Sequence, residues 1–287
     1  IVEKFIVEPD QISKEMQYIK YNIEYTQKAY GLEDVKEVDF PVENNLTKQD
    51  LIKNDNVIKN IRINDYRPTN QVYNQLQGIR SYYVFNDVDV DRYNIDGEYT
   101  QVFLSARELD QNKLDEQAKT WINEYLKYTH GYGLALSPVN SVTTEGQPQL
   151  LVKNIPPITN TNLKITQPEI YFGEKTNEYV IVNTEEKEFD YPAGSDNVEI
   201  SYEGDAGIKL TGFNKLLFAI RKGSLKIIIS NKINSDSKIV LNRNIVDRVN
   251  KIASFIYYDS DPYLVVNQDD GKLYWIIEGF TASEKYP

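Results

Sequence analysis

The sequence predicts an α+β fold, with mixed or antiparallel sheets built from hairpins and with amphipathic helices interspersed among the strands. Strand-like and helix-like segments follow one another without the regular strand–helix–strand period of a parallel α/β protein. Two Asp-Gly pairs, Asp96-Gly97 and Asp270-Gly271, lie between strand-like runs, and Gly tolerates the positive φ of tight hairpin turns. Hydrophobic residues at 40% and charged residues at 26% are typical of a globular chain of this length, 287 residues.

Three helices are expected in the first eighty residues, each with a recognisable start. Ser13 is the expected N-cap of a helix over residues 13–30, whose apolar positions follow helical spacing. Thr47 and Asp50 match a capping box, with Asp in place of the usual Glu. Pro68 begins the third helix, since proline is tolerated in a first helical turn.

The remaining elements follow from alternation or from helical spacing of apolar residues. Further helices are predicted over residues 114–128, 213–222 and 243–253, the last with Ile252 among its inward positions. Strands are predicted over residues 1–7, 56–63, 82–93, 98–104, 169–172, 179–183, 197–202, 225–230, 263–266 and 273–280.

A stretch rich in Pro, Thr and Asn separates two halves of the chain. Residues 141–168, which contain Pro156-Pro157, are predicted as a linker or a long excursion. The expected organisation is an acidic α+β subdomain over residues 1–140 and a second α+β subdomain with a basic block over residues 169–287. A single fused domain is the alternative.

Composition excludes several classes of function. The chain has no cysteine, which excludes thiol catalysis, zinc–thiolate sites and disulfides. Its net charge of −11 disfavours nucleic-acid binding, which needs a cationic surface. The 22 tyrosines favour amphipathic, half-buried strands, with an aromatic sugar- or peptide-binding surface as the alternative. No signal peptide and no run of about 18 apolar residues occurs.

A row of aspartates is the first candidate site. Asp87, Asp89, Asp91 and Glu98 occupy positions one, three, five and twelve of a calcium-loop register. The sixth position, which needs Gly, is Arg92, and the flanks read as strands rather than helices. On a strand the three Asp share one face. Pairing with nearby arginines is the structural interpretation, and a calcium-type cation site is the functional one; no other cofactor is expected.

His130, the only histidine, is the second candidate. It precedes Gly131-Tyr132-Gly133, and it serves either as a general base or as a partner of last-turn carbonyls. The Gly pair either lets backbone approach a ligand or turns the chain. The sequence contains neither a phosphate-binding Gly loop nor a Gly-x-Ser-x-Gly motif, and a catalytic carboxylate pair cannot be selected among 43 acidic residues.

A basic block is the third candidate. Residues 206–255 hold ten basic and two acidic residues, a balance of +8 against −19 for the rest of the chain. These side chains are expected either on solvated helix faces or against anionic lipid or a wall polymer. The expected contact residues are Lys215, Arg221, Lys222, Lys226, Arg243, Arg248 and Lys251.

Several long strings resemble the uncharacterised bacterial protein family 0182. Among them are Phe85–Tyr93 (FNDVDVDRY), Leu104–Leu109 (LSAREL) and Tyr128–Gly133 (YTHGYG). The resemblance runs through essentially the whole chain. It implies a large plasma-membrane protein with several N-terminal transmembrane helices, whose extracytoplasmic region begins with this chain. The family has no established activity, so the resemblance carries no functional residue over.

The expected function is therefore that of an extracytoplasmic, non-enzymatic domain that binds a ligand or partner for its own transmembrane region. The first residue, Ile1, fits a piece cut from a longer protein. Two alternatives stay open. One is a hydrolase that acts on envelope glycans through a carboxylate pair, and the other is a structural scaffold with a large exposed apolar patch.

Overall fold

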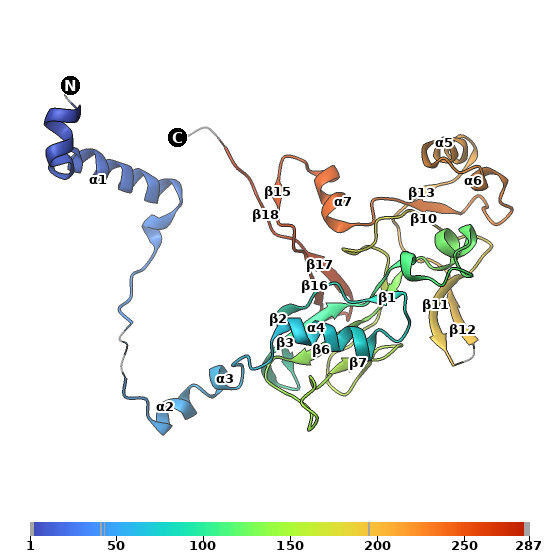
Figure 1. Ribbon diagram of the computed structural model, residues 1–287, viewed down its shortest axis with the longest axis horizontal. Coiled ribbons are helices and arrows are strands. Elements are labelled where there is room, and N and C mark those ends of the chain that lie inside the picture. Colours follow the sequence, from blue (N-terminus) through green and yellow to red (C-terminus); the bar gives the residue numbers. More distant parts are fainter. Residues whose placement is uncertain (1–2, 41, 43, 195, 284–287) are drawn as a thin grey trace. The chain divides into compact units, whose positions relative to one another are not determined.

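The computed structural model describes residues 3–40, 42, 44–194 and 196–283, and it confirms the α+β class (Figure 1). Contacts divide the chain into two units. Unit 1 holds residues 1–50 and 283–287, and unit 2 holds residues 51–282. The segment 141–168 contributes strands to the main sheet of unit 2. The boundary predicted at that segment, with subdomains on either side, stays a prediction.

Unit 1 consists of helices without a buried residue among those described. Helical turns over Glu3–Val7 and Glu8–Asp10 lead into α1, Gln11–Ala29. The strand predicted over residues 1–7 is therefore wrong for residues 3–7, while Ile1 and Val2 lie outside the described residues. After α1, Gly31 adopts a φ of 64°, the left-handed conformation that ends a helix.

The helix α2, Lys48–Lys53, begins with the capping box that the sequence predicts. The Thr47 backbone N–H donates to Asp50 Oδ2 at 2.9 Å, and the Asp50 N–H donates to Thr47 Oγ1 at 3.3 Å. These reciprocal bonds satisfy two N–H groups that have no partner within the helix.

The centre of unit 2 is an antiparallel five-stranded sheet in the order β2-β3-β6-β7-β8. Its strands are β2 Asp89–Ile95, β3 Glu98–Ala106, β6 Leu134–Pro138, β7 Val152–Lys153 and β8 Ile158–Thr159. The Asp96-Gly97 turn joins β2 to β3 as predicted, with φ values of 52° and 90°.

The two faces of this sheet pack against different elements. Alternation along β3 sends Val102 and Leu104 to one face and Phe103 to the other. The first face meets the C-terminal hairpin of β16, Tyr263–Val266, and β17, Leu273–Ile276.

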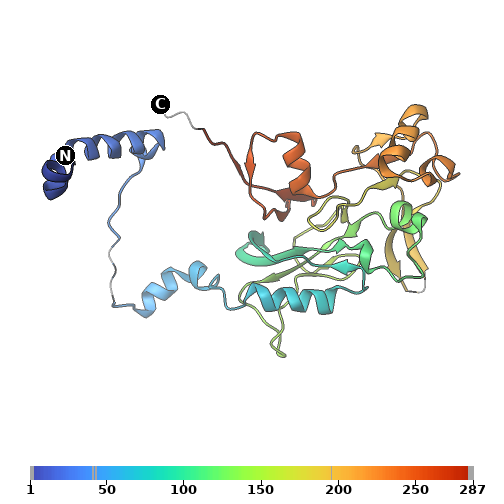
Figure 2. The same ribbon diagram turned by 45° about the horizontal axis from the view of Figure 1, so that its top comes forward.

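The second face meets α4, Tyr66–Val72, and the helical turn Tyr73–Gln77, which lie along the sheet in Figure 2. Buried Tyr73 donates through its hydroxyl to the Phe103 carbonyl at 3.2 Å and lies 2.7 Å from Ser137 Oγ.

A second core lies around the three-stranded sheet β10-β14-β13. It is covered by α5, Gly212–Lys222, and α6, Lys226–Ile229.

The other helices of unit 2 are α3 Asp55–Ile58 and α7 Ile245–Ile252, with helical turns over Leu32–Asp34 in unit 1 and Gln111–Lys113 and Asn123–Lys127 in unit 2. The remaining strands are β1 Tyr83–Val84, β4 Glu108–Leu109, β5 Gly131–Tyr132, β9 Glu169–Ile170, β10 Val180–Val182, β11 Glu188–Ala193, β12 Asp196–Ile200, β13 Ile208–Lys209, β14 Lys238–Val240, β15 Tyr257–Tyr258 and β18 Gly279–Phe280.

Four further sequence predictions, all within unit 2, differ from the structure. The strand expected over residues 56–63 is the helix α3 followed by a turn, and the strand expected over 225–230 is the helix α6. Both are short apolar runs, which periodicity cannot assign to strand or helix. The helix expected over 114–128 is helical only from Trp121 to Lys127, because 115–118 forms a turn. Ile252, expected to face inward, is 72% exposed.

Arg107 is the buried cation on which the corner between β3 and β4 depends, and its side chain is fully buried. Its guanidinium donates to the carbonyls of Gln77 at 2.8 Å, Tyr132 at 2.8 Å and Asn154 at 3.2 Å. Burial lowers the pKa of Arg107 to about 10, so the group stays charged at neutral pH.

We predict that Arg107→Met lowers the free energy of unfolding by about 3 kcal/mol, because three buried carbonyls lose their donor. Urea unfolding followed by circular dichroism measures the change. Arg67→Met is the matched control: Arg67 is exposed and pairs with Asp65 at 3.1 Å, so its loss should cost under about 1 kcal/mol. Equal effects of the two substitutions would contradict the assignment.

Candidate functional site

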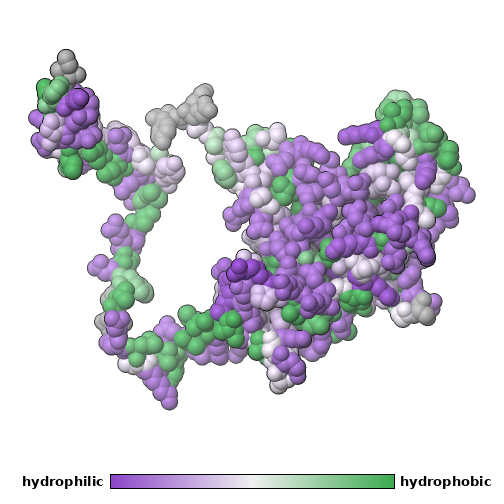
Figure 3. Space-filling model, in the orientation of Figure 1, coloured by the Kyte–Doolittle hydropathy of each residue, from purple (hydrophilic) through white to green (hydrophobic). Residues whose placement is uncertain are grey.

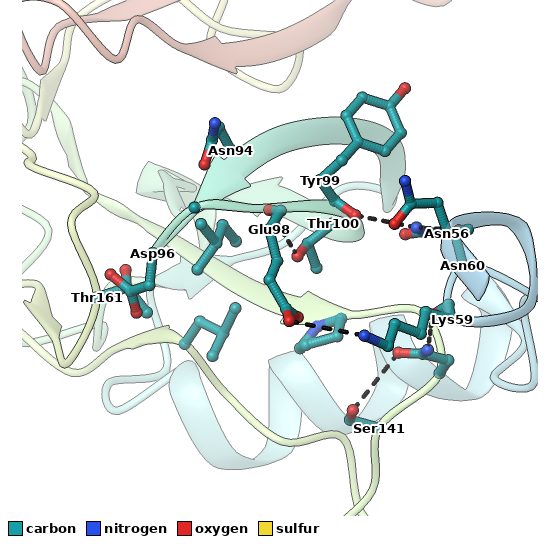
Figure 4. Close-up of a pocket in the computed structure, with 15 residues that line it drawn as sticks. Asn56, Lys59, Asn60, Asn94, Asp96, Glu98, Tyr99, Thr100, Ser141 and Thr161 are labelled. Atoms are coloured by element: carbon teal, nitrogen blue, oxygen red, sulfur yellow. Dashed lines mark hydrogen bonds and ion pairs between the residues drawn. The ribbon is translucent and has the colours of Figure 1, made fainter. Parts of the chain in front are cut away.

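A polar groove of about 840 Å³ lies at the end of the β2–β3 hairpin (Figure 4). Most of its lining side chains carry amides or hydroxyls; Tyr99 lines it through its backbone, and Figure 4 shows its ring directed away from Glu98 and Thr100 on the same strand. These polar lining residues are Asn56, Asn60, Asn94, Thr100, Asn140, Ser141 and Thr161.

Local hydrogen bonds hold one wall of this groove against the hairpin. Asn60 follows α3; its Nδ2 donates to the Tyr99 carbonyl at 2.9 Å and its Oδ1 accepts from the Gln101 N–H at 2.6 Å. Asn140 Nδ2 donates to the Lys59 carbonyl. Within the described part of the chain, the Asn56 side chain has no hydrogen-bond partner, so its amide is available to a ligand.

The charged groups of the groove are a lysine and two carboxylates. Lys59 Nζ lies 2.8 Å from Asp55 Oδ2 and 3.7 Å from Glu98 Oε1, and the hydrogen bond to Asp55 raises the pKa of Lys59. Figure 4 shows Glu98 reaching from β3 toward Lys59, whereas Asp96 points toward Thr161. The two carboxylates of the groove, Asp96 and Glu98, therefore point to different places.

A second cluster joins carboxylates from three segments far apart in the sequence. Oxygens of Asp87, Glu174 and Asp261 lie within 4.8 Å of one another. Asp87, Asp89 and Asp261 also line a hollow of about 350 Å³ beside Tyr66. Carboxylates at this spacing repel one another unless they hold protons or share a cation.

Buried Glu108 on β4 positions Glu174. Its Oε1 accepts from the Glu174 N–H at 2.9 Å, and its Oε2 accepts from the Lys175 N–H at 3.0 Å. A Cβ on Gly173 would lie 2.1 Å from Glu108 Oε2, so a larger residue there would displace this buried carboxylate from its hydrogen bonds. Burial raises the pKa of Glu108.

Burial and mutual repulsion raise the pKa values of three carboxyls in this cluster. Two causes raise the pKa of Asp87 to about 6: desolvation is the larger, and repulsion by the Asp261 carboxylate is the next. Desolvation and Asp87 raise the pKa of Asp89 to about 7 and that of Glu174 to about 8. Near neutral pH the cluster is therefore partly protonated.

The aspartate row predicted from the sequence is divided by the structure. Asp87 and Asp89 lie in the carboxylate cluster, while Asp91 accepts from the Arg92 N–H at 2.8 Å and lines a different hollow. Glu98 lies at the opposite end of the hairpin, in the polar groove. A calcium-type site over all four residues is thus not assembled, because an extended hairpin cannot bring its two ends together.

His130 is fully buried in a polar network. Its Nδ1 lies 2.9 Å from Thr129 Oγ1, which donates to Glu188 Oε2 at 2.5 Å. Its Nε2 lies 3.3 Å from Asp190 Oδ1, and its ring stacks on Tyr171 at 4.7 Å. With its side chain closed off from solvent, His130 has a structural role in this conformation, and burial raises the pKa of Glu188 beside it.

The Gly pair after His130 also has a structural role. A Cβ on Gly131 would lie 2.4 Å from the Arg107 carbonyl, and Gly133 has a φ of 68° with Pro157 beside it. These glycines allow β5 to approach the corner that holds Arg107 and Glu108.

The predicted basic contact residues do not form one surface. Arg243 is 1% exposed and donates to the carbonyls of Tyr171 and Thr129, so including it was wrong. Arg248 stacks on Phe172 at 4.6 Å and Lys251 bonds Asn242 at 2.7 Å. The remaining four lie on α5 and α6: Lys215, Arg221, Lys222 and Lys226.

The sequence alone missed the partners of Asp87. Glu174 and Asp261 lie in loops, 87 residues apart in the chain, and no spacing rule joins them. The groove was missed as well, because its amides come from several loops. The sequence feature that pointed toward the groove was the Asp96-Gly97 turn, because it predicted the hairpin whose end forms part of the groove.

Fold and surfaces together define a class: an α+β protein with a polar groove, a carboxylate cluster and a buried histidine network. The chain belongs to the Uncharacterised protein family (UPF0182), whose model matches residues 1–287. It is 56% identical over 286 residues to a UPF0182 protein of Alkaliphilus metalliredigens. It is also 53% identical over 287 residues to one of Clostridium botulinum and 50% identical to one of Clostridium tetani.

The matches cover the whole of this chain but only 30–32% of those relatives' lengths. The chain thus spans about a third of the curated relatives that it matches. No solved structure matches it. Among the described residues, no helix combines the length and the apolar character needed to cross a bilayer.

We predict that unit 2 loses stability as the pH rises from about 4 to about 8. The native carboxyls of Asp87, Asp89 and Glu174 keep protons that the unfolded chain, with carboxyl pKa values near 4, has already released. Glu174→Gln should flatten this dependence and raise the melting temperature at pH 8 by a few degrees. Calorimetric melting across this pH range measures it; Asp269→Asn, an exposed acid elsewhere, is the control and should leave the slope unchanged.

A hard cation at this cluster stays a prediction, now centred on Asp87 with Glu174 and Asp261 as partners. If Ca²⁺ binds, it raises the melting temperature at pH 8 and releases heat in a titration, since a ligand of the native state stabilises it. Glu174→Gln should abolish both effects and Asp269→Asn neither. Absence of heat and of any rise with the unmodified chain would remove the cation hypothesis.

Proposed function

We propose that this chain is an extracytoplasmic, non-enzymatic binding module of a longer plasma-membrane protein, and that its polar groove binds an uncharged, hydroxyl-rich ligand such as a wall glycan. The resemblance to the family supports the location, and its own transmembrane region is then a partner. The groove is the single observation that carries the ligand class: about 840 Å³ lined by asparagine amides and by the hydroxyls of Thr100, Ser141 and Thr161.

The chemistry of the groove favours a neutral polyol. Amides and hydroxyls both donate and accept hydrogen bonds, as sugar hydroxyls do. The charged lining residues are Lys59, Asp96 and Glu98, which leave no excess positive charge for a polyanion or a nucleic acid.

The hydrolase alternative depends on two carboxylates placed on either side of a scissile bond. Asp96 and Glu98 are the pair that the groove offers, and Figure 4 shows their side chains directed at different partners. Binding without turnover is therefore the function that the groove supports better. The scaffold alternative rests on a different surface, the exposed apolar residues of α5 and α6.

We expect uncharged N-acetylglucosamine oligosaccharides, used as the probe, to bind the chain in titration calorimetry. Asn56→Leu should weaken binding about fivefold, because it removes a contact worth about 1 kcal/mol. Asn250→Leu is the matched control, since Asn250 is exposed and lies outside the groove.

Two results would contradict the proposal. Binding that is unchanged in Asn56→Leu would place the ligand elsewhere, and failure of the oligosaccharides to bind at all would remove the ligand class. Release of new reducing ends, lost in Glu98→Gln, would replace the binding module by a hydrolase.

A further inference from the structure

The exposed face of α5 is apolar where a surface helix should be polar. Phe213, Leu216, Leu217 and Ile220 follow the i, i+3, i+4, i+7 spacing of one helix face. Phe213 is 71% exposed and Ile220 is 70% exposed. The opposite face already packs into the second core through Phe218 and Ala219. The outer stripe is therefore an additional apolar surface beyond the one that folding uses.

This stripe continues beyond α5. Leu225, just before α6, is 73% exposed, and Ile229 at its end is 76% exposed. A hollow of about 330 Å³ lined by Trp121, Ile122 and Ile229 adjoins α6. Figure 3 shows the result as a green area at the upper right, where Figure 1 places α5 and α6. We call this surface the α5–α6 tip, defined by Phe213, Leu216, Leu217, Ile220, Leu225 and Ile229.

The charges of the α5–α6 tip have a single sign. Residues 206–235 contain six basic residues and no acidic one, in a chain with a net charge of −11. On the two helices these are Lys215, Arg221, Lys222 and Lys226. Arg221 and Lys226 are exposed beside the apolar stripe, whereas Lys215 and Lys222 lie on the Phe218 side of α5, and Lys222 Nζ is 4.9 Å from the centre of the Tyr179 ring. Lysine is depleted at the centres of protein–protein interfaces. An apolar stripe bordered by Lys and Arg is instead the composition of helices that lie in the headgroup region of an anionic bilayer.

We propose that the α5–α6 tip docks on an anionic lipid bilayer, with the apolar stripe seated at the boundary of headgroups and acyl chains and the basic side chains on lipid phosphates. Long basic side chains reach the headgroups while their stems cover apolar surface. The inference rests on the proposed function only for its location beside a membrane. The groove and the α5–α6 tip involve different residues, so either can fail alone.

Flotation with vesicles tests this docking. Vesicles of phosphatidylcholine alone are compared with vesicles that also contain about one third phosphatidylglycerol, at low and high salt. We expect binding to the anionic vesicles only, and its loss at about 0.5 M salt because the charges are then screened. Arg221→Gln with Lys226→Gln should reduce partitioning about fivefold per charge. Phe213→Ser with Ile220→Ser should reduce it at least tenfold.

Matched controls lie elsewhere on unit 2. Phe255→Ser removes a phenylalanine that is 75% exposed, and Lys153→Gln removes an exposed lysine on β7. Both should leave partitioning unchanged. Equal binding to neutral and anionic vesicles, binding to neither, or dependence on the charges with no effect of Phe213→Ser and Ile220→Ser would each overturn the proposal. A titration with the oligosaccharides, which reports on the groove alone, separates this failure from failure of the proposed function.

A second measurement does not rely on loss of binding. The chain has no cysteine, so Phe213→Cys carries a single environment-sensitive fluorophore. We expect a blue shift on addition of anionic vesicles, and quenching by lipids with a nitroxide near the headgroup. In the longer protein, with any other cysteines replaced, a blue shift without lipid would mean that another protein segment covers the α5–α6 tip, and this would overturn the proposal.

Discussion

Two adjacent buried charges at the end of β3 organise unit 2. Arg107 donates to carbonyls from three separate segments, and Glu108 accepts N–H groups from the loop at 174–175. A buried charge is tolerable only when its hydrogen bonds are satisfied. The loops that supply hydrogen-bond partners to Arg107 and Glu108 are therefore fixed in position around these two side chains. The requirement for glycine at 131 and 173 follows, because both backbones approach this corner too closely for a Cβ.

The same strand links this corner to the functional surfaces. At its start, β3 presents Glu98, Tyr99 and Thr100 to the polar groove. Just beyond its end, Glu108 on β4 fixes the backbone of Glu174 and so brings that carboxylate beside Asp87. The geometry of both sites therefore depends on one strand whose central residues are fully buried. The groove is built on that rigid strand, and so its amides are positioned before a ligand arrives.

Sequence reasoning succeeded where one local rule decides the outcome. The Asp96-Gly97 hairpin, the Thr47–Asp50 cap and the helix α7 each depend on residues within a few positions. It failed where the outcome depends on distant partners. The run at 225–230 is apolar in either a strand or a helix, and only its packing makes it α6. Arg243 carries the same charge as Arg221, yet Arg243 is buried and donates to three carbonyls while Arg221 is exposed.

Helical periodicity shows that a face is apolar, but it does not say what covers that face. In α5 the apolar residues form two sets: Phe218 and Ala219 pack into the second core, and Phe213, Leu216 and Ile220 repeat at helical spacing on the other side. A core needs only the first. The second set remains outside any core of the described residues, and acidic side chains are missing from residues 206–235. An apolar stripe that lacks carboxylates and is bordered by cations fits an anionic interface better than open water. Because exposing this stripe to water is unfavourable, the α5–α6 tip is a surface that functions in contact with something else.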